Sequence, residues 1–139
     1  MDISAIMTTA VLTAKPDDHV GDALRVLDDQ LIRHLPVVED GRLVGMVSDR
    51  DLREYRLPLL EEVEHPDRAE ALMNTSLADV MNPTVITVEP SESLGTAIDL
   101  ILEYGVGALP VVDSETGALI GIVSYVDILR ALRSEIDDL

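Results

Sequence analysis

The sequence has no cysteine, no tryptophan and no phenylalanine, and tyrosine, at three positions, is its only aromatic residue. Without cysteine the chain forms no disulfide and offers no thiolate for metal binding or nucleophilic catalysis. This fits a protein of the reducing cytoplasm, which is the localisation that we expect. Single-stranded nucleic acids are usually bound on aromatic platforms, and this sequence has few residues with which to build one.

Positive charge is also scarce. Lys15 is the only lysine, ten basic residues stand against 27 acidic ones, and the formal net charge is −17. Such a surface repels phosphate backbones and anionic lipids, so we expect neither nucleic acid nor membrane as a partner. No apolar run approaches the length of a membrane span, and the N-terminus does not resemble a signal peptide. The acidity indicates an ordinary solvated surface or, alternatively, adaptation to high salt.

The most informative feature is an internal repeat. Residues 45–51 return as residues 121–127, and both stretches follow the pattern Gly-x-x-Ser-x-x-Asp. Upstream, residues match at an offset of 74, including Leu-Pro-Val-Val at 35–38 and at 109–112. Residues 113–117 add two positions, after which the offset is 76. Because a polar, glycine-containing turn tolerates insertion, we interpret the chain as one unit written twice.

Hydrophobic periodicity predicts the same elements in both copies. A short helical turn precedes an extended segment that is closed by a proline, and an amphipathic helix follows. Two short strands joined in a hairpin come next, and a further helix begins after each motif serine. In the first copy these elements are expected at residues 2–7, 11–13, 20–31, 35–38, 42–47 and 49–56. In the second copy the equivalent turn, extended segment and helices are expected at 77–81, 85–87, 94–102 and 126–139.

The repeats predict the domain organisation. Residues 1–57 form the first repeat, residues 58–74 a connector with a short helix, and residues 75–139 the second repeat. The connector is acidic at 61–64, and its helix begins at Pro66, where a missing N–H is tolerated. Repeats of about sixty residues are marginal alone, so we expect the two to share a core.

The order of elements, the segment from Ile32 to Val38 and the two Gly-x-x-Ser-x-x-Asp endings resemble the cystathionine β-synthase (CBS) domain, present as a tandem pair. The resemblance covers nearly all residues outside the connector. It implies an α+β fold in which two β-α-β-β-α repeats are related by pseudo-two-fold symmetry and packed through their sheets. It also implies a regulatory module rather than an enzyme, and a homodimer.

The motif residues Ser48 and Asp51, like Ser124 and Asp127, permit two interpretations. A serine at the N-cap of a helix with an aspartate at N3 approaches a capping box, which needs no ligand. Alternatively, the hydroxyl donates to a phosphate beside the helix amides, while the carboxylate one turn away accepts from a ribose diol. Both interpretations remain open at this point.

In CBS pairs similar to this one, adenosine nucleotides bind with the aspartate on the ribose and the serine or threonine near the phosphate. By this resemblance, the first site consists of Leu12, Thr13, His34, Leu35, Pro36, Ser48 and Asp51, and we add Arg33 and Arg50 to it for their charge. The second site consists of Ile86, Thr87, Ala108, Leu109, Pro110, Ser124 and Asp127. We expect AMP, ADP or ATP as the ligand, with Mg²⁺ accompanying ATP, and no covalently bound cofactor.

The two copies differ in charge around the motif. The first has nearby basic residues at Lys15, Arg33, His34, Arg50 and Arg53, whereas the second has mainly apolar residues at the matching places. Because arginine forks recognise phosphate well, we predict that the first copy binds the charged ligand more tightly. The second copy then accepts a less charged adenosine compound or stays empty. The alternative for Arg33 is an ordinary solvent-facing residue.

A ligand-free dimerisation scaffold, with the serines and aspartates only as caps, is the main alternative, and a sensor of S-adenosylmethionine or of a dinucleotide is another. The three histidines show no paired ligand spacing, so no zinc site is predicted. A Ser-His-Asp order and a phosphate-binding loop are both missing, so we predict no enzyme. The output is expected to lie in an unknown effector protein or in a longer protein of which this chain is a fragment.

Overall fold

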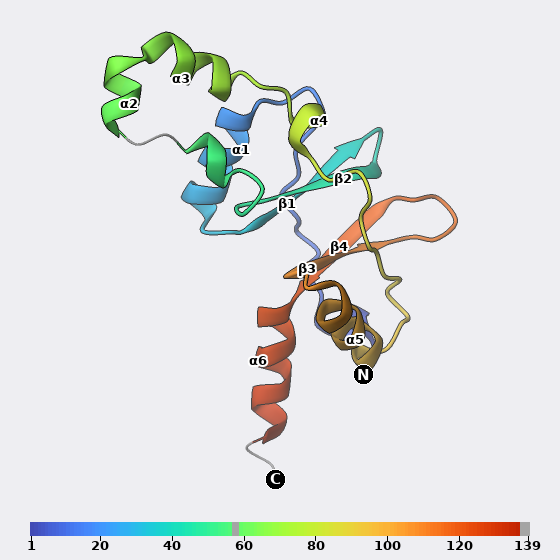
Figure 1. Ribbon diagram of the computed structural model, residues 1–139. Helices are drawn as coiled ribbons and strands as arrows, with labels where there is room; N and C mark the ends of the chain where they lie inside the picture. Colours follow the sequence, from blue (N-terminus) through green and yellow to red (C-terminus); the bar gives the residue numbers. More distant parts are fainter. Residues whose placement is uncertain (57–58, 137–139) are drawn as a thin grey trace. The chain divides into compact units, whose positions relative to one another are not determined.

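The computed structural model describes residues 1–56 and 59–136 and has the mixed α+β fold expected from the sequence. Its strands form two two-stranded sheets, β1 (His34–Glu39) with β2 (Arg42–Ser48) and β3 (Ala108–Val112) with β4 (Leu119–Ser124). The α-helices are α1 (Val20–Gln30), α2 (Leu59–Glu64), α3 (Pro66–Met73), α4 (Leu77–Val80), α5 (Leu94–Tyr104) and α6 (Tyr125–Ile136) (Figure 1). Two 3₁₀ helices lie at Ile3–Ala5 and Arg53–Tyr55. None of the helices in the described ranges is both long and apolar enough to span a bilayer.

Single bridges widen both sheets. One parallel bridge joins Ala14 to Val37, and the matching bridge of the second repeat joins Val88 to Val111. The extended segments predicted at 11–13 and 85–87 are thus not strands. Each is followed by a single residue that pairs with the sheet, Ala14 in the first repeat and Val88 in the second. In a parallel ladder the next bond would come from the N–H two residues later. That residue is a proline in both copies, which has no N–H to donate, so pairing stops.

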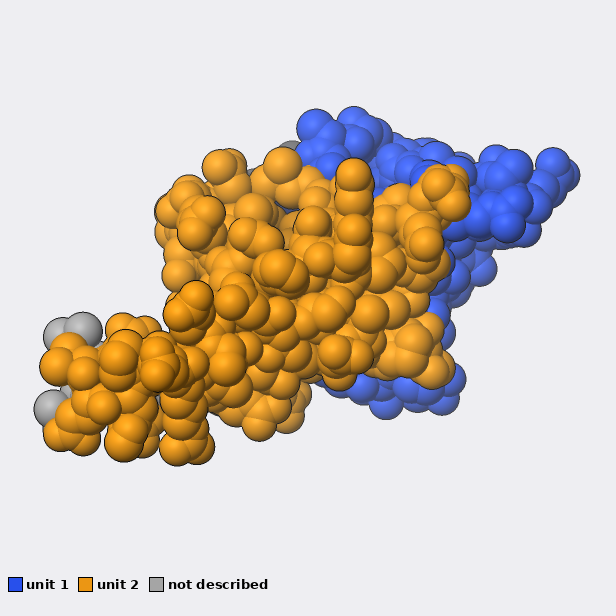
Figure 2. All heavy atoms as spheres, turned by 90° about the horizontal axis from the view of Figure 1, so that it is seen from above, with its two compact units in different colours: residues 1–11, 41–43, 85–139 blue, residues 12–40, 44–84 orange. Residues whose placement is uncertain are grey.

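The chain divides into two compact units, and each unit takes segments from both repeats (Figure 2). Unit 1 contains Met1–Val11, Gly41–Leu43 and Val85–Leu139, and unit 2 contains Leu12–Asp40 and Val44–Thr84. In unit 1, Thr8 and Ile122 exchange two backbone hydrogen bonds of 2.8 and 2.9 Å, and in unit 2 Met46 and Asn82 exchange two of 3.0 and 2.9 Å. The short turn that opens each repeat therefore pairs with the hairpin of the other repeat.

Each unit has its own aliphatic core. Ile3, from the turn that opens the first repeat, is fully buried in unit 1 with Leu109 and Val123. Leu77, from the matching turn in α4, is fully buried in unit 2 with Leu35. Each repeat therefore supplies one large side chain to a core that is built mainly from the other repeat.

The prediction of an α-helix after Ser48 is wrong. Residues 49–52 form turns, and only the 3₁₀ helix Arg53–Tyr55 follows. In the second repeat, α6 begins directly after Ser124 and runs for 12 residues, as predicted except that 137–139 lie outside the described residues. In the sequence of the first copy Pro58 follows closely, and a proline disfavours helical conformation in the residue before it, whereas no proline follows Ser124.

Helices α1 and α5 follow the predicted periodicity except at one end. Leu31, expected to close the apolar stripe of α1, is its C-cap instead, with a left-handed φ of 53° and a side chain that is 90% exposed. Gly105 occupies the matching position after α5, with a φ of 65°. Glycine adopts this conformation without a steric penalty, and leucine does not.

Candidate functional site

In both units the hairpin places the end of its second strand beside the start of its first. The backbone N–H of Asp49 donates to the carbonyl oxygen of Arg33 at 2.9 Å. The equivalent bond in the second repeat runs from Tyr125 to Gly107 at 3.1 Å. The motif serine, one residue earlier, consequently lies across from the residue that opens the first strand.

A third segment reaches the same edge of each sheet. Ala14 N donates to Pro36 O at 2.9 Å, and Val38 N donates to Ala14 O at 2.8 Å. This parallel pairing brings Leu12 and Thr13 alongside the start of β1. In the second repeat Val88 makes the same two bonds, to Pro110 and from Val112, at 3.1 and 2.9 Å, which brings Ile86 and Thr87 alongside β3. Each predicted site is therefore assembled from three segments of one unit.

The predicted site residues differ in how accessible they are. Leu35 and Leu109 belong to the two hydrophobic cores, so their side chains are not available to a ligand. Pro36, Ala108 and Pro110 are buried as well. The half-buried residues are His34, Ser48, Ile86, Ser124 and Asp127. The exposed residues are Leu12, Thr13, Arg33, Arg50, Asp51 and Thr87.

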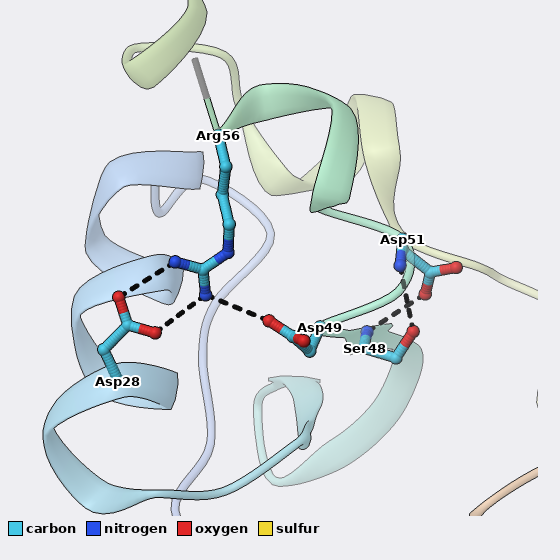
Figure 3. A network of polar contacts seen from close by, with 5 residues as sticks. All are labelled: Asp28, Ser48, Asp49, Asp51 and Arg56. Carbon is cyan, nitrogen blue, oxygen red and sulfur yellow. Dashed lines mark hydrogen bonds and ion pairs between the residues drawn. The ribbon is translucent and has the colours of Figure 1, made fainter. Parts of the chain in front are cut away.

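The motif serines and aspartates are bonded to each other. Ser48 N donates to Asp51 Oδ2 at 3.0 Å, and Asp51 N donates to Ser48 Oγ at 3.1 Å (Figure 3). The corresponding bonds between Ser124 and Asp127 measure 2.9 and 3.2 Å. Both pairs thus have the geometry of caps. Within residues 1–56 and 59–136 only Oδ2 of each carboxylate is engaged, so the cap orients the group while Oδ1 keeps its lone pairs for another donor.

The two caps differ in the use of the serine hydroxyl. Ser124 Oγ donates to Asp127 Oδ2 at 3.0 Å. Ser48 Oγ makes no such bond to any described residue and acts only as an acceptor from Asp51 N. The hydroxyl proton of the first repeat is consequently left for an external acceptor, whereas that of the second repeat is already used.

His34 opens β1 next to Asp51 and Arg33. Burial lowers the pKa of the imidazole, the carboxylate of Asp51 raises it, and the guanidinium of Arg33 lowers it again, with a net decrease from 6.5. The ring is therefore mainly neutral at pH 7 and has one donor and one acceptor nitrogen. A neutral imidazole at this edge suits hydrogen bonding to a heterocycle better than charge pairing.

An ion-pair network beside the first site was missed by the sequence analysis. Arg56 donates to both carboxylate oxygens of Asp28, at 2.7 and 3.0 Å, and to Asp49 Oδ1 at 2.9 Å (Figure 3). The hydrogen bonds to Asp28 raise the pKa of Arg56 above its usual range and lower the pKa of Asp28. Since Asp49 directly follows Ser48, this network ties the loop of the first site to α1. No local pattern connects charges 28 residues apart.

Metal binding has no comparable support. In the part of the chain that the structure describes, no group of three or more histidine, aspartate or glutamate side chains is placed to hold a metal ion.

These features define a class of protein, a tandem pair of small α+β repeats that each end their hairpin in a capped Ser-x-x-Asp motif. A family model described as CBS domain matches residues 3–58 and 77–134, which is most of the chain. The chain belongs to the CBS domain family and carries two copies of the domain.

Known proteins resemble the chain over almost its whole length. A CBS domain-containing protein of Dictyostelium discoideum is 35% identical over 132 residues, which cover 94% of this chain and 90% of that protein. The crystal structure of CBSX2 in complex with AMP is 32% identical, with a TM-score of 0.79 and 96% of each chain covered. A CBS domain pair of protein MJ0100, solved with 5′-methylthioadenosine and S-adenosyl-L-methionine, is 25% identical, with a TM-score of 0.76 and coverage of 95% and 99%.

Enzymes are matched only in part. Inosine-5′-monophosphate dehydrogenase of Methanocaldococcus jannaschii is 32% identical over 121 residues, yet these are 21% of that enzyme and 86% of this chain. The matched family is a regulatory module rather than a catalytic domain, and the match covers only a small part of this enzyme.

Proposed function

We propose that this chain is a regulatory module of the cytoplasm that binds AMP, ADP or ATP and transmits occupancy to an effector protein through the geometry of a homodimer. The observation that carries the proposal is the first cap. One carboxylate oxygen of Asp51 and the hydroxyl proton of Ser48 form no hydrogen bond with the described residues, and both groups lie at the end of β2. The complex of CBSX2 with AMP supports an adenosine nucleotide as the ligand, because that protein matches this chain over 96% of its length.

The groups of the first site suit the parts of a nucleotide. In this proposal Asp51 Oδ1 would accept from the ribose 2′- and 3′-hydroxyls, and Ser48 would donate to the phosphate. Among the described residues neither Arg33 nor Arg50 forms an ion pair, so both guanidinium groups are available for phosphate oxygens. The backbone of Leu12 and Thr13 would border the base. Mg²⁺ would enter with ATP as part of the ligand.

The second site has fewer groups for an anion. The hydroxyl of Ser124 is engaged by Asp127, and the residues matching Arg33 and Arg50 are Gly107 and Val126. We infer that this site accepts a less charged adenosine compound or remains empty. Because a ligand shifts only the state that it prefers, a charged nucleotide would act through the first repeat.

Two alternatives are each favoured by one observation. The complex of MJ0100 with S-adenosyl-L-methionine favours an S-adenosylmethionine sensor, and a dinucleotide sensor is a variant of the same idea. The reciprocal caps favour a scaffold that binds no ligand, because a complete cap stabilises the turn or helix that follows it without any ligand.

Calorimetry with AMP, ATP, NADH and S-adenosylmethionine distinguishes these functions. We expect Asp51→Ala to weaken AMP binding by about ten- to a hundredfold, the cost of one charge-assisted hydrogen bond. Asp127→Ala is the matched control, since it removes an equivalent cap and should leave AMP binding unchanged. Equal losses in the two variants would contradict the asymmetry. Binding of none of the four compounds would favour the scaffold.

A further inference from the structure

Arg56 joins two carboxylates of unit 2 beside the first site, and we call Asp28, Asp49 and Arg56 the Arg56 network. The guanidinium group donates twice to Asp28, at 2.7 and 3.0 Å, and once to Asp49, at 2.9 Å. The side chains of Arg56, Asp28 and Asp49 are 37%, 58% and 45% exposed. Ion pairs between side chains this exposed contribute little to folding stability. The stability of the fold therefore does not explain the network.

Asp49 brings a negative charge next to the proposed phosphate position. It directly follows Ser48, whose hydroxyl would donate to the phosphate, and Figure 3 shows its carboxylate directed toward Arg56. Because neighbouring Cα atoms are about 3.8 Å apart, this carboxylate lies within about 10 Å of the serine hydroxyl. A carboxylate at this distance repels a phosphate through water unless a cation offsets it.

Arg56 supplies that cation. Two carboxylates alone would have a charge of −2, and the guanidinium group brings the Arg56 network to −1. Arg33 and Arg50, in contrast, form no ion pair with any described residue. The arginines of the first repeat thus separate into two roles, because Arg56 is engaged by carboxylates while Arg33 and Arg50 are left for an anion.

The second repeat has no such arrangement. In the register of the repeat, the network residues correspond to uncharged ones: Leu102 for Asp28, Tyr125 for Asp49 and Leu132 for Arg56. Ser124 and Asp127 nevertheless form the same reciprocal cap. The cap consequently does not need the network. The network occurs in the repeat whose site is proposed to take the more charged ligand.

We propose that Arg56 sets the preference of the first site for phosphorylated ligands, by offsetting the charge of Asp49 rather than by touching the ligand. The inference rests on the proposed function, because it concerns the ligand of the same site. A nucleotide gains from Arg56 in proportion to its negative charge. Adenosine, which has no phosphate, gains nothing.

Calorimetry of Arg56→Gln with adenosine, AMP and Mg²⁺-free ATP measures this dependence on charge. At about 10 mM salt a charge about 10 Å away is barely screened, so affinity should fall about threefold for AMP and about eightfold for ATP. The affinity for adenosine should not change. At about 0.5 M salt the losses should disappear. Arg68→Gln, which removes an equal charge at an exposed residue of α3, is the matched control and should weaken AMP binding less than Arg56→Gln does.

Two further variants separate charge from local structure. Arg56→Lys keeps the charge but loses the bidentate fork, so AMP affinity should stay near that of the wild type. Arg56→Gln combined with Asp49→Asn removes one cation and one carboxylate, and should recover wild-type AMP affinity. An equal loss for all three ligands in Arg56→Gln, or no recovery in the double variant, would show a purely structural role and overturn the inference.

The same titrations distinguish this inference from the proposed function. A wild type that binds AMP, with Arg56→Gln equal to it for AMP and ATP at low salt, would refute the role of Arg56 and leave the sensor standing. A wild type that binds none of the three compounds would refute the sensor and this inference with it. Urea unfolding of each variant checks that the fold is retained.

Discussion

The sulfur of Met7 lies 2.8 Å from the position that a Cβ atom on Gly121 would occupy, and the carbonyl oxygen of Thr8 lies 3.0 Å from it. The first repeat repeats this relationship, with Met81 Sδ at 2.5 Å from the Cβ position of Gly45. The glycine of each Gly-x-x-Ser-x-x-Asp motif therefore admits the close approach of the opposite repeat's opening turn. Glycine is needed at these positions because it has no side chain and not because of its backbone freedom, since neither glycine has a positive φ.

Gly121→Ala should destabilise the protein by about 1–3 kcal/mol, because a backbone carbonyl is among the atoms that the methyl group meets. Gly95→Ala, in α5, is the matched control, since its Cβ would meet only Ser93 Oγ at 3.7 Å. Alanine in that helix should leave stability unchanged or raise it. Urea unfolding of both variants measures the difference, and equal losses would contradict the close-approach explanation.

Ile3→Ala should destabilise unit 1, although Ile3 belongs to the first repeat. The side chain is fully buried against Leu109 and Val123, and such truncations cost about 2–5 kcal/mol. Val63→Ala, at an exposed residue of α2, should change stability by less than about 0.5 kcal/mol. Amide hydrogen exchange should show the loss of protection in β3 and β4. Loss confined to β1 and β2 would argue against the exchanged turn.

Leu31→Gly should stabilise the protein by about 0.5–1 kcal/mol. Leu31 has a left-handed backbone conformation that leucine adopts at a steric cost, and its exposed side chain contributes little packing. Leu31→Ala is the control, because alanine keeps the Cβ atom that causes the cost. Thermal unfolding compares the two variants. Stabilisation by alanine as large as that by glycine would show that the side chain, and not the backbone, is responsible.

His34 should make stability depend on pH in the weakly acidic range. Its pKa is lowered in the folded state, mainly by burial, so the unfolded chain takes up a proton first as the pH falls through 6.5. The stability that the folded protein gains by keeping His34 neutral is present above pH 6.5 and is lost as the pH falls toward the folded-state pKa. His34→Gln should therefore lose less stability than the wild type between about pH 7.5 and pH 5.5.

The same residue offers a direct spectroscopic check. Asp51 raises the pKa of His34 against the effect of burial, so Asp51→Asn should lower that pKa further in an NMR titration. A pKa above 6.5 in the wild type, or an increase in Asp51→Asn, would contradict the environment described for His34.

Much of the fold and of the candidate site could be predicted because it depends on local patterns and on their repetition. The helices α1 and α5 follow from apolar residues at helical spacing, and the first hairpin from Asp40 and Gly41, which both have positive φ. The pairing of Ser48 with Asp51 needs only three intervening peptide bonds, so a capping box was visible as a possibility in the sequence. Which oxygen and which proton remain for a ligand was not visible.

The amino-acid sequence by itself determined the duplication, the order of elements, the family and the motif residues, because each is a pattern of spacing along the chain. Only the tertiary structure decided that each opening turn pairs with the hairpin of the other repeat, and that Arg56 joins Asp28 to Asp49. These are contacts between segments far apart in sequence. They depend on how packing and loop closure place those segments, for which local periodicity carries no signal.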